Sequence, residues 1–123
     1  MTAIEIVDRL KVLAPNVAFG VSRKIDGYDK WDGDGEDPRE EGYEGYSVTV
    51  KAVAIEDGKI IEGIDSLGSC YMKPDEEIGD VHGYLLQMLQ QAATELSENA
   101  NGGEIEDQLD AALGFLKQEM RNR

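Results

Sequence analysis

The sequence predicts an α+β domain in the order α-β-β-β-α-α, with a three-stranded antiparallel sheet and the helices packed on one of its faces. Two patterns predict this class. Apolar residues recur at helical spacing at the start of the chain and twice after residue 80, and they alternate in stretches between residues 17 and 72. With 123 residues, the chain fits a single domain, 1–123, that can bury one modest core.

The first helix is expected over residues 2–14. Thr2 and Glu5 have the spacing of a capping box, in which the two side chains bond to main-chain N–H groups at the helix start. Pro15 ends the helix, because proline pushes the residue before it out of the helical conformation. The first strand follows from 17 to 25, with four apolar residues on one side: Val17, Phe19, Val21 and Ile25.

The second strand is expected from Tyr46 to Ile55, which alternates and is rich in β-branched residues. The stretch 56–59, Glu-Asp-Gly-Lys, predicts a hairpin turn into a third strand that ends at Met72. The alternation of this third strand slips near Gly63 and again near Gly68, so we expect a bulge or bend at those places.

Two amphipathic helices complete the chain. Asp80 has the position of an N-cap, and apolar residues recur at helical spacing from Val81 to Leu96. Residues 99–103, with two glycines, end this helix. The last helix is expected from about Glu104 to 121, with acidic residues at its start and basic ones at its end, as the helix dipole favours.

A long acidic loop, at about 26–45, separates the first two strands. Residues 25–46 carry nine acids against two bases, Lys30 and Arg39, which gives −7. A loop of this length in a compact domain is usually either functional or disordered. It also holds or borders half of the eight aromatic residues of the chain, namely Tyr28, Trp31, Tyr43 and Tyr46.

The net charge excludes several classes of partner. Twenty-six acids and twelve bases give −14, and such a surface repels nucleic acid and anionic membranes. The acids fall in two blocks: the loop, and the window from 74 to 116, which has ten acids and no base. We therefore expect a cation or a basic protein as the partner, with no direct nucleic acid and no membrane.

No pattern in the sequence indicates catalysis, a cofactor or a metal centre. Asp32, Asp34 and Glu36 resemble the start of a calcium loop, but Asp37 and Tyr43 stand where the EF-hand needs glycine and glutamate. Cys70 and His82 are each the only residue of their type, so no zinc set of Cys and His is available. We expect Cys70 to fill a core position, the protein not to be an enzyme, and no signal or membrane segment.

Carboxylates in a row can imitate the phosphates of a nucleic acid. In an extended segment, side chains two residues apart lie on one side about 6.8 Å apart, and Asp32, Asp34 and Glu36 follow that spacing. Such a row would fit a groove of lysines and arginines built for phosphates. Aromatic residues such as Trp31 would add desolvated anchors to a charged interface.

The small size, the element order and the strong negative charge resemble the phage-encoded DNA-mimic inhibitors of the anti-CRISPR and anti-restriction type. The resemblance is one of architecture and charge, without a motif match, and it carries over no individual residue. It implies a phage or mobile-element protein in the bacterial host cytoplasm, bound to the nucleic-acid-binding surface of a defence complex.

The sequence therefore predicts a non-enzymatic acidic inhibitor that blocks a basic nucleic-acid-binding protein or nucleoprotein complex. Two alternatives stay open. One is a self-assembling accessory protein of a phage, a homodimer formed through the two last helices, and the other is a calcium-binding protein that uses the acidic loop. The expected partner contacts of the inhibitor are Asp29, Trp31, Asp32, Asp34, Glu36, Asp37, Glu40, Glu41 and Tyr43.

Overall fold

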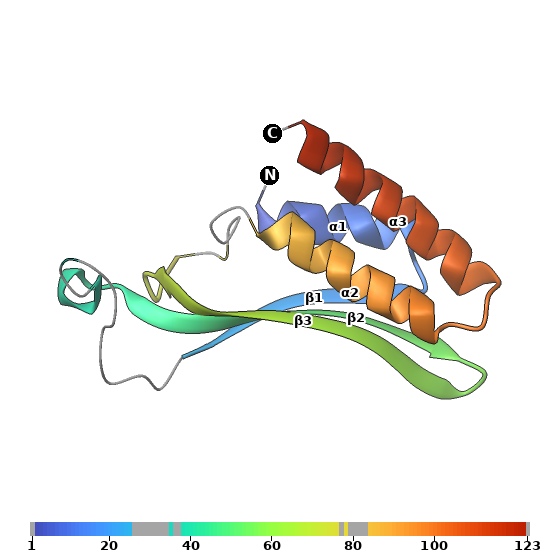
Figure 1. Cartoon of the computed structure of the whole chain (residues 1–123), viewed down its shortest axis with the longest axis horizontal. Helices are drawn as coiled ribbons and strands as arrows, with labels where there is room; N and C mark the ends of the chain where they lie inside the picture. The colour runs from blue at the N-terminus through green and yellow to red at the C-terminus, as the bar shows by residue number, and fades with distance from the viewer. Residues whose placement is uncertain (1, 26–34, 36–37, 77, 79–83, 123) are drawn as a thin grey trace.

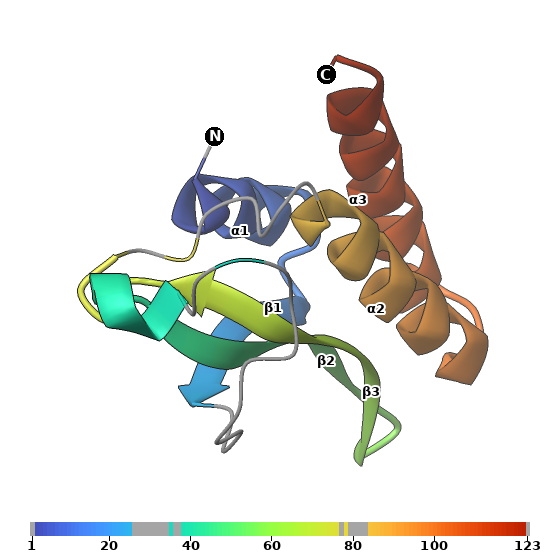
Figure 2. The same ribbon diagram turned by 60° about the vertical axis from the view of Figure 1, so that its left-hand side comes forward.

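The computed structural model describes residues 2–25, 35, 38–76, 78 and 84–122, and it confirms the predicted α+β class. Three helices lie on one side of an antiparallel sheet (Figures 1 and 2). A short 3-10 helix, η1, lies within the acidic loop. The elements are α1 (Ala3–Leu13), β1 (Val17–Ile25), η1 (Pro38–Glu41), β2 (Glu44–Glu56), β3 (Lys59–Met72), α2 (Leu85–Asn99) and α3 (Glu104–Arg121).

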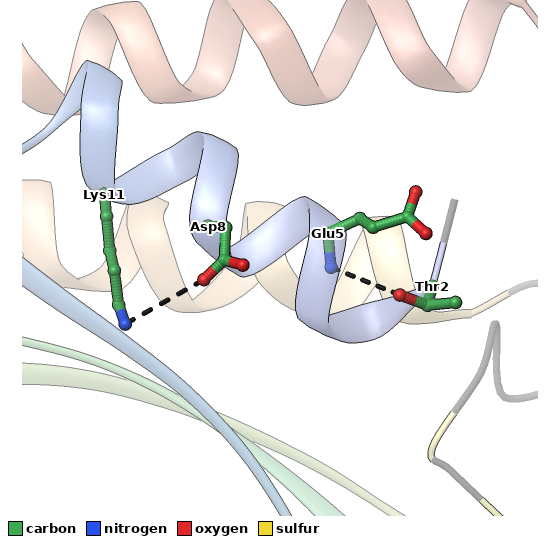
Figure 3. A network of polar contacts seen from close by, with 4 residues as sticks. All are labelled: Thr2, Glu5, Asp8 and Lys11. Atoms are coloured by element: carbon green, nitrogen blue, oxygen red, sulfur yellow. Dashed lines mark hydrogen bonds and ion pairs between the residues drawn. The ribbon is translucent and has the colours of Figure 1, made fainter.

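The structure shows the Thr2 half of the predicted capping box at the start of α1. Thr2 is the N-cap, and its Oγ1 accepts a hydrogen bond of 3.2 Å from the main-chain N–H of Glu5 (Figure 3). One turn further on, an exposed ion pair joins Asp8 and Lys11 at 4.0 Å. The other side of the helix is buried through Ala3, Ile6 and Leu10, so α1 is fixed to the core by one apolar stripe.

The sheet has the order β1-β2-β3, with antiparallel pairing throughout. All nine residues of β1 pair in register with β2, from Val17 opposite Ala54 to Ile25 opposite Tyr46. The predicted hairpin turn between β2 and β3 is present. Asp57 and Gly58 have φ angles of 52° and 77°, and two successive positive φ angles are the mark of a tight two-residue hairpin.

One of the two predicted irregularities in β3 is confirmed. The register shifts where Val48 faces Leu67 and Tyr46 faces Cys70, which leaves one extra residue in β3 around Gly68. At Gly63 there is no bulge, because Gly63 stays paired with Ala52 in a continuous register. The glycine is needed there for a different reason, which is the close approach of α2.

Helix α2 lies directly on β3 at Gly63. A Cβ atom added at Gly63 would overlap the main-chain oxygen of Ala92 and would lie 2.7 Å from the main-chain nitrogen of Leu96. Small residues on both sides, Ala52 on β2 and Ala93 on α2, are fully buried at 0% exposure. Gly63 is therefore a contact point between helix and sheet.

The core fills the space between the helices and the covered face of the sheet. Helix α2 alone buries seven apolar residues and α3 buries four. Cys70 is buried to 1% exposure in this core, in agreement with the prediction that it fills a core position. The strand residues of the core are Val17, Phe19, Tyr46, Val48, Val50, Ala52, Ala54, Cys70 and Met72.

Two helix boundaries bear on the sequence predictions. Helix α3 begins at Glu104, as expected. Helix α2 begins at Leu85, with Tyr84 at the cap position, while the predicted N-cap Asp80 and the turn after it lie outside the described residues. Residues 85–99 contain the whole apolar stripe that packs on the sheet, so the register of that helix is as predicted.

The second face of the sheet carries none of the described helices (Figure 1) and few of the described charges. By the cross-strand pairing, its charged positions are Lys24, Lys51 and Glu62, one on each strand. Near the β2–β3 turn it exposes three isoleucines, Ile55, Ile60 and Ile64, of which Ile60 is 72% exposed. The charge of −14 therefore belongs mainly to other parts of the surface.

Candidate binding surface

The described carboxylates gather most densely at one end of the molecule. There the β2–β3 turn lies at the same end as the end of α2, the loop after it and the start of α3 (Figure 1). Two hydrogen bonds join these segments: the main-chain N–H of Asn101 donates to Glu56 Oε1 (2.8 Å), and Asn99 Nδ2 donates to the carbonyl oxygen of Glu62 (3.1 Å). We call this region the acidic end, and its acids are Glu56, Asp57, Glu62, Glu95, Glu98, Glu104, Glu106, Asp107 and Asp110.

The carboxylates of the acidic end are open to solvent and uncompensated. Six of the nine are exposed and the others, Glu56, Glu95 and Glu106, are partly exposed. None of the nine makes an ion pair with a residue that the structure describes. The one base in these segments is Lys59, so nine acids and one base leave −8 of the total −14 at this end. Mutual repulsion among these groups must be offset by the core beneath them.

The acids that the fold brings together at the acidic end differ from the block of acids, 74 to 116, that the sequence analysis grouped. The block from 74 to 116 is split in space, because α2 runs along the sheet away from the segment that follows β3 and carries Glu95 and Glu98 away from Asp75 and Glu76. In place of these two acids, the β2–β3 turn contributes Glu56, Asp57 and Glu62, which sequence reasoning left out of the candidate site. A signal for them was present, since a helix that follows β3 and packs back along it must end near the turn that begins β3.

The opposite end of the sheet holds the described part of the acidic loop. Of the predicted contact residues there, Glu40 and Glu41 lie in η1 and are exposed. The described acids of this end are mixed with Lys24 and Lys73, so its described residues are more balanced in charge than those of the acidic end. The other acids and the tryptophan of the predicted set lie outside the described residues: Asp29, Trp31, Asp32, Asp34, Glu36 and Asp37.

Two tyrosines at the loop end are covered by cations of the same chain. The guanidinium of Arg23 lies 4.7 Å from the ring centre of Tyr46, and Lys73 Nζ lies 5.6 Å from the ring centre of Tyr43. Arg23 also donates to the carbonyl oxygen of Pro74 (2.7 Å) and to Sδ of Met72 (2.8 Å). Tyr46 is buried in the core and Tyr43 is half-buried, so both rings help to hold the segment after β3 against the sheet.

Among the described residues, no three of the types His, Cys, Asp and Glu are placed to hold a metal ion. The acids of the calcium alternative, Asp32, Asp34 and Glu36, lie outside the described part of the chain. None of the helices that the structure describes combines the length and apolar character needed to cross a lipid bilayer.

Comparison with known proteins gives no further lead: no protein-family model, no curated protein and no solved structure matches this chain.

Proposed function

We propose that this protein is a non-enzymatic inhibitor whose acidic end occupies the nucleic-acid-binding surface of a basic protein or nucleoprotein complex. The observation that carries the proposal is the concentration of nine solvent-accessible carboxylates at the acidic end, with one lysine among them. Unpaired carboxylates in such number raise the local negative potential, which attracts a surface rich in lysine and arginine and speeds association with it.

The arrangement of these acids supports imitation of a polyanion. Two hydrogen bonds tie the β2–β3 hairpin to the end of α2 and the loop after it, and α3 packs against α2. The carboxylates therefore have a defined spatial arrangement instead of following one flexible tail. A pre-organised set of charges binds without the cost of ordering it first. Charge that merely kept the protein in solution would need no such concentration at one end.

The partner class follows from the charge and the resemblance to DNA-mimic inhibitors. We propose a bacterial defence complex of the CRISPR or restriction type, met in the host cytoplasm after phage infection. Such complexes hold their nucleic acids in positively charged channels, which are the surfaces that an acidic end of this kind would block.

The acidic loop is proposed as a second contact. The two ends lie on the order of 40 Å apart along β3, which is several times the Debye length of about 8 Å at physiological salt. Each end therefore attracts a partner independently. Trp31, and Tyr43 with its partly covered ring, stay predicted anchors of the loop contact.

The described residues give less support to the alternative of a dimer through the last two helices. Most of the apolar stripe of α2 is buried in its own domain, as is that of α3 through Ile105, Leu109, Ala112 and Leu116. The exposed members of the two stripes are Tyr84 and Met120. Phe115, which lies off the stripe, is half-buried against the same core.

Two charge-reversal variants of equal charge test the proposal and serve as controls for each other. One replaces Asp57, Glu98 and Asp107 by lysine at the acidic end, and the other replaces Asp32, Asp34 and Glu36 by lysine in the loop. The measurement is capture of proteins from bacterial lysate on immobilised protein, at low and high salt, followed by elution with duplex DNA.

The parent protein is expected to retain a basic nucleoprotein complex at low salt and to release it to DNA or to high salt. The acidic-end variant is expected to lose at least tenfold more captured complex than the loop variant. If neither variant changes capture while both keep the melting temperature of the parent, the carboxylates are not the binding surface and the proposal fails.

A further inference from the structure

The tip of the β2–β3 hairpin carries exposed apolar side chains beside its acids. Ile55 and Ile60 pair across the two strands, and they are 69% and 72% exposed. The Cβ atoms of directly opposite residues lie about 5 Å apart, so the two isoleucines form one continuous surface. Ile64, on the same face of β3, is 37% exposed and extends this surface along the strand. We call Ile55, Ile60 and Ile64 the isoleucine patch.

An apolar hollow of about 640 Å³ adjoins the isoleucine patch. It lies where β2 runs on beyond Val17 and Ala54, the outermost pair of β1 and β2 at this end, and Ile55 is one of its lining residues. Among the described residues that line it, only Lys11 carries a charge, and Lys11 is paired with Asp8. An apolar side chain brought here by a partner would therefore be buried mainly among uncharged neighbours.

Acids of the acidic end stand on two sides of this apolar surface. Glu56 and Asp57 follow the patch at the turn, and Glu62 lies between two of its isoleucines on the same face. On the other side, the main-chain N–H of Asn16, which lines the hollow, donates to Gln108 Oε1 of α3 (2.8 Å). This bond holds the hollow beside the first turns of α3, which carry four acids of the acidic end. An apolar centre with a charged rim is the usual anatomy of a protein interface.

The fold itself makes little use of the isoleucine patch. Its three residues lie on the face of the sheet that none of the described helices covers, and none of them belongs to the buried core or packs against it. Threonine would give the strands the same branched side chain with less apolar surface. Contiguous apolar surface with a polar rim is a mark of an interaction site.

We propose that the isoleucine patch and the hollow are the apolar anchor of the contact made by the acidic end. Their partner is a protein surface on which apolar side chains stand among lysines and arginines. This inference rests on the proposed function and adds an apolar requirement to it. Charge selects the occupant, because the acidic rim repels nucleic acid and anionic lipid, and a second copy would bring two acidic rims together.

The two parts of this surface are expected to control different steps of binding. The carboxylates attract a basic partner over a distance, so they speed its association, and salt weakens their effect. Burial of the isoleucines slows dissociation instead and depends little on salt. The contribution of the isoleucine patch to affinity should therefore persist at a salt concentration that screens the carboxylates.

The probes for the test are two synthetic peptides of equal positive charge, KKLKLKK and KKSKSKK. In an extended peptide the two leucines lie on one side, as a surface that covers the patch requires. Binding to the parent protein is measured by NMR titration of its main-chain amides. The leucine peptide is expected to bind about threefold more tightly or better, with its largest shifts at Ile55 and Ile60. This preference is expected at both low and high salt.

The decisive variant is I55T/I60T, which keeps branched side chains in both strands and so keeps the sheet. It is expected to lose the preference for the leucine peptide and to bind the serine peptide as the parent does. Ile4→Thr is the matched control, since Ile4 is 58% exposed at the start of α1, away from the acidic end (Figure 1). This control is expected to keep the preference.

The possible results separate this inference from the proposed function. Equal binding of the two peptides by the parent, or a preference that survives in I55T/I60T, overturns the inference while the acidic end keeps its role. Sedimentation equilibrium should show a monomer for both proteins, and a parent dimer that I55T/I60T dissociates would assign the patch to a second copy and overturn the inference. If the acidic-end variant binds both peptides as tightly as the parent, the proposed function fails, and this inference fails with it.

Discussion

The two faces of the sheet differ in the space that they leave for a side chain at a glycine position. Gly63 lies on the covered face, where a single added carbon would overlap the main chain of Ala92. Gly20 lies on the open face, where an added Cβ would have no atom within 4 Å. Both are strand glycines with ordinary φ angles, so the difference comes from the helix above one of them. Contact with α2, more than strand geometry, decides what a position in this sheet tolerates.

The largest effect expected from this contrast is that of Gly63→Val. Valine is a better strand former than glycine, yet at this position it must push α2 off the sheet. We expect a loss of more than about 4 kcal/mol in the free energy of unfolding, measured with urea. Gly20→Val is the control and should be neutral or slightly stabilising. Equal effects at the two positions would mean that α2 does not touch the sheet as described.

A smaller but still large effect is expected from removing buried apolar atoms. Leu89, on the covered side, has 0% exposure, and Leu89→Ala should cost about 3 kcal/mol through lost burial and the cavity left behind. Ile60→Ala, on the open face, should change stability by less than about 0.5 kcal/mol. Thermal and urea unfolding of the two variants measure the difference, and a large cost at Ile60 would indicate that the open face is covered in solution.

The third effect concerns neighbouring cations on opposite faces. Arg23→Gln removes the cation over the ring of Tyr46 and the bond to Pro74, so it should cost about 1–2 kcal/mol. Lys24→Gln, one residue on and exposed, should cost almost nothing. Urea unfolding of the two variants side by side tests whether the segment after β3 is held by Arg23, and similar values would deny that role.

The smallest effect is expected at the cap of α1. Thr2→Ala removes the acceptor for the N–H of Glu5 and should cost about 1 kcal/mol, whereas Thr2→Ser keeps an acceptor and should cost much less. The shift of the melting temperature measures both. Identical values for alanine and serine would mean that the cap does not hold the helix on the covered face.

Much of the fold follows from local patterns in the sequence. The cap at Thr2, the alternation from Val17 and the turn at Asp57 and Gly58 act over a few residues, so they fix where elements begin and end. The reason for Gly63 was beyond such reasoning. Its constraint comes from Ala92 and Leu96, about thirty residues further along the chain, and only the packing of α2 brings them together.

The candidate site was predicted less completely than the fold. Charge counting along the sequence found Glu95 and Glu98 on the helix, but it grouped them with Asp75 and Glu76 at the far end of the sheet. It left out Asp57, because a turn with two or three acidic residues is not unusual when only the sequence is considered. Electrostatic fields add over distances in space, and the folded chain sets those distances.

The buried thiol of Cys70 can be used to measure how often one corner of the molecule opens. The only thiol of the chain sits behind the end of β3 that Arg23 and the segment after Met72 hold in place. A thiol-labelling reagent can reach it only when that corner opens, so the labelling rate reports how often the corner does so. The opening of the loop end can thus be timed through a residue that belongs to neither acidic surface.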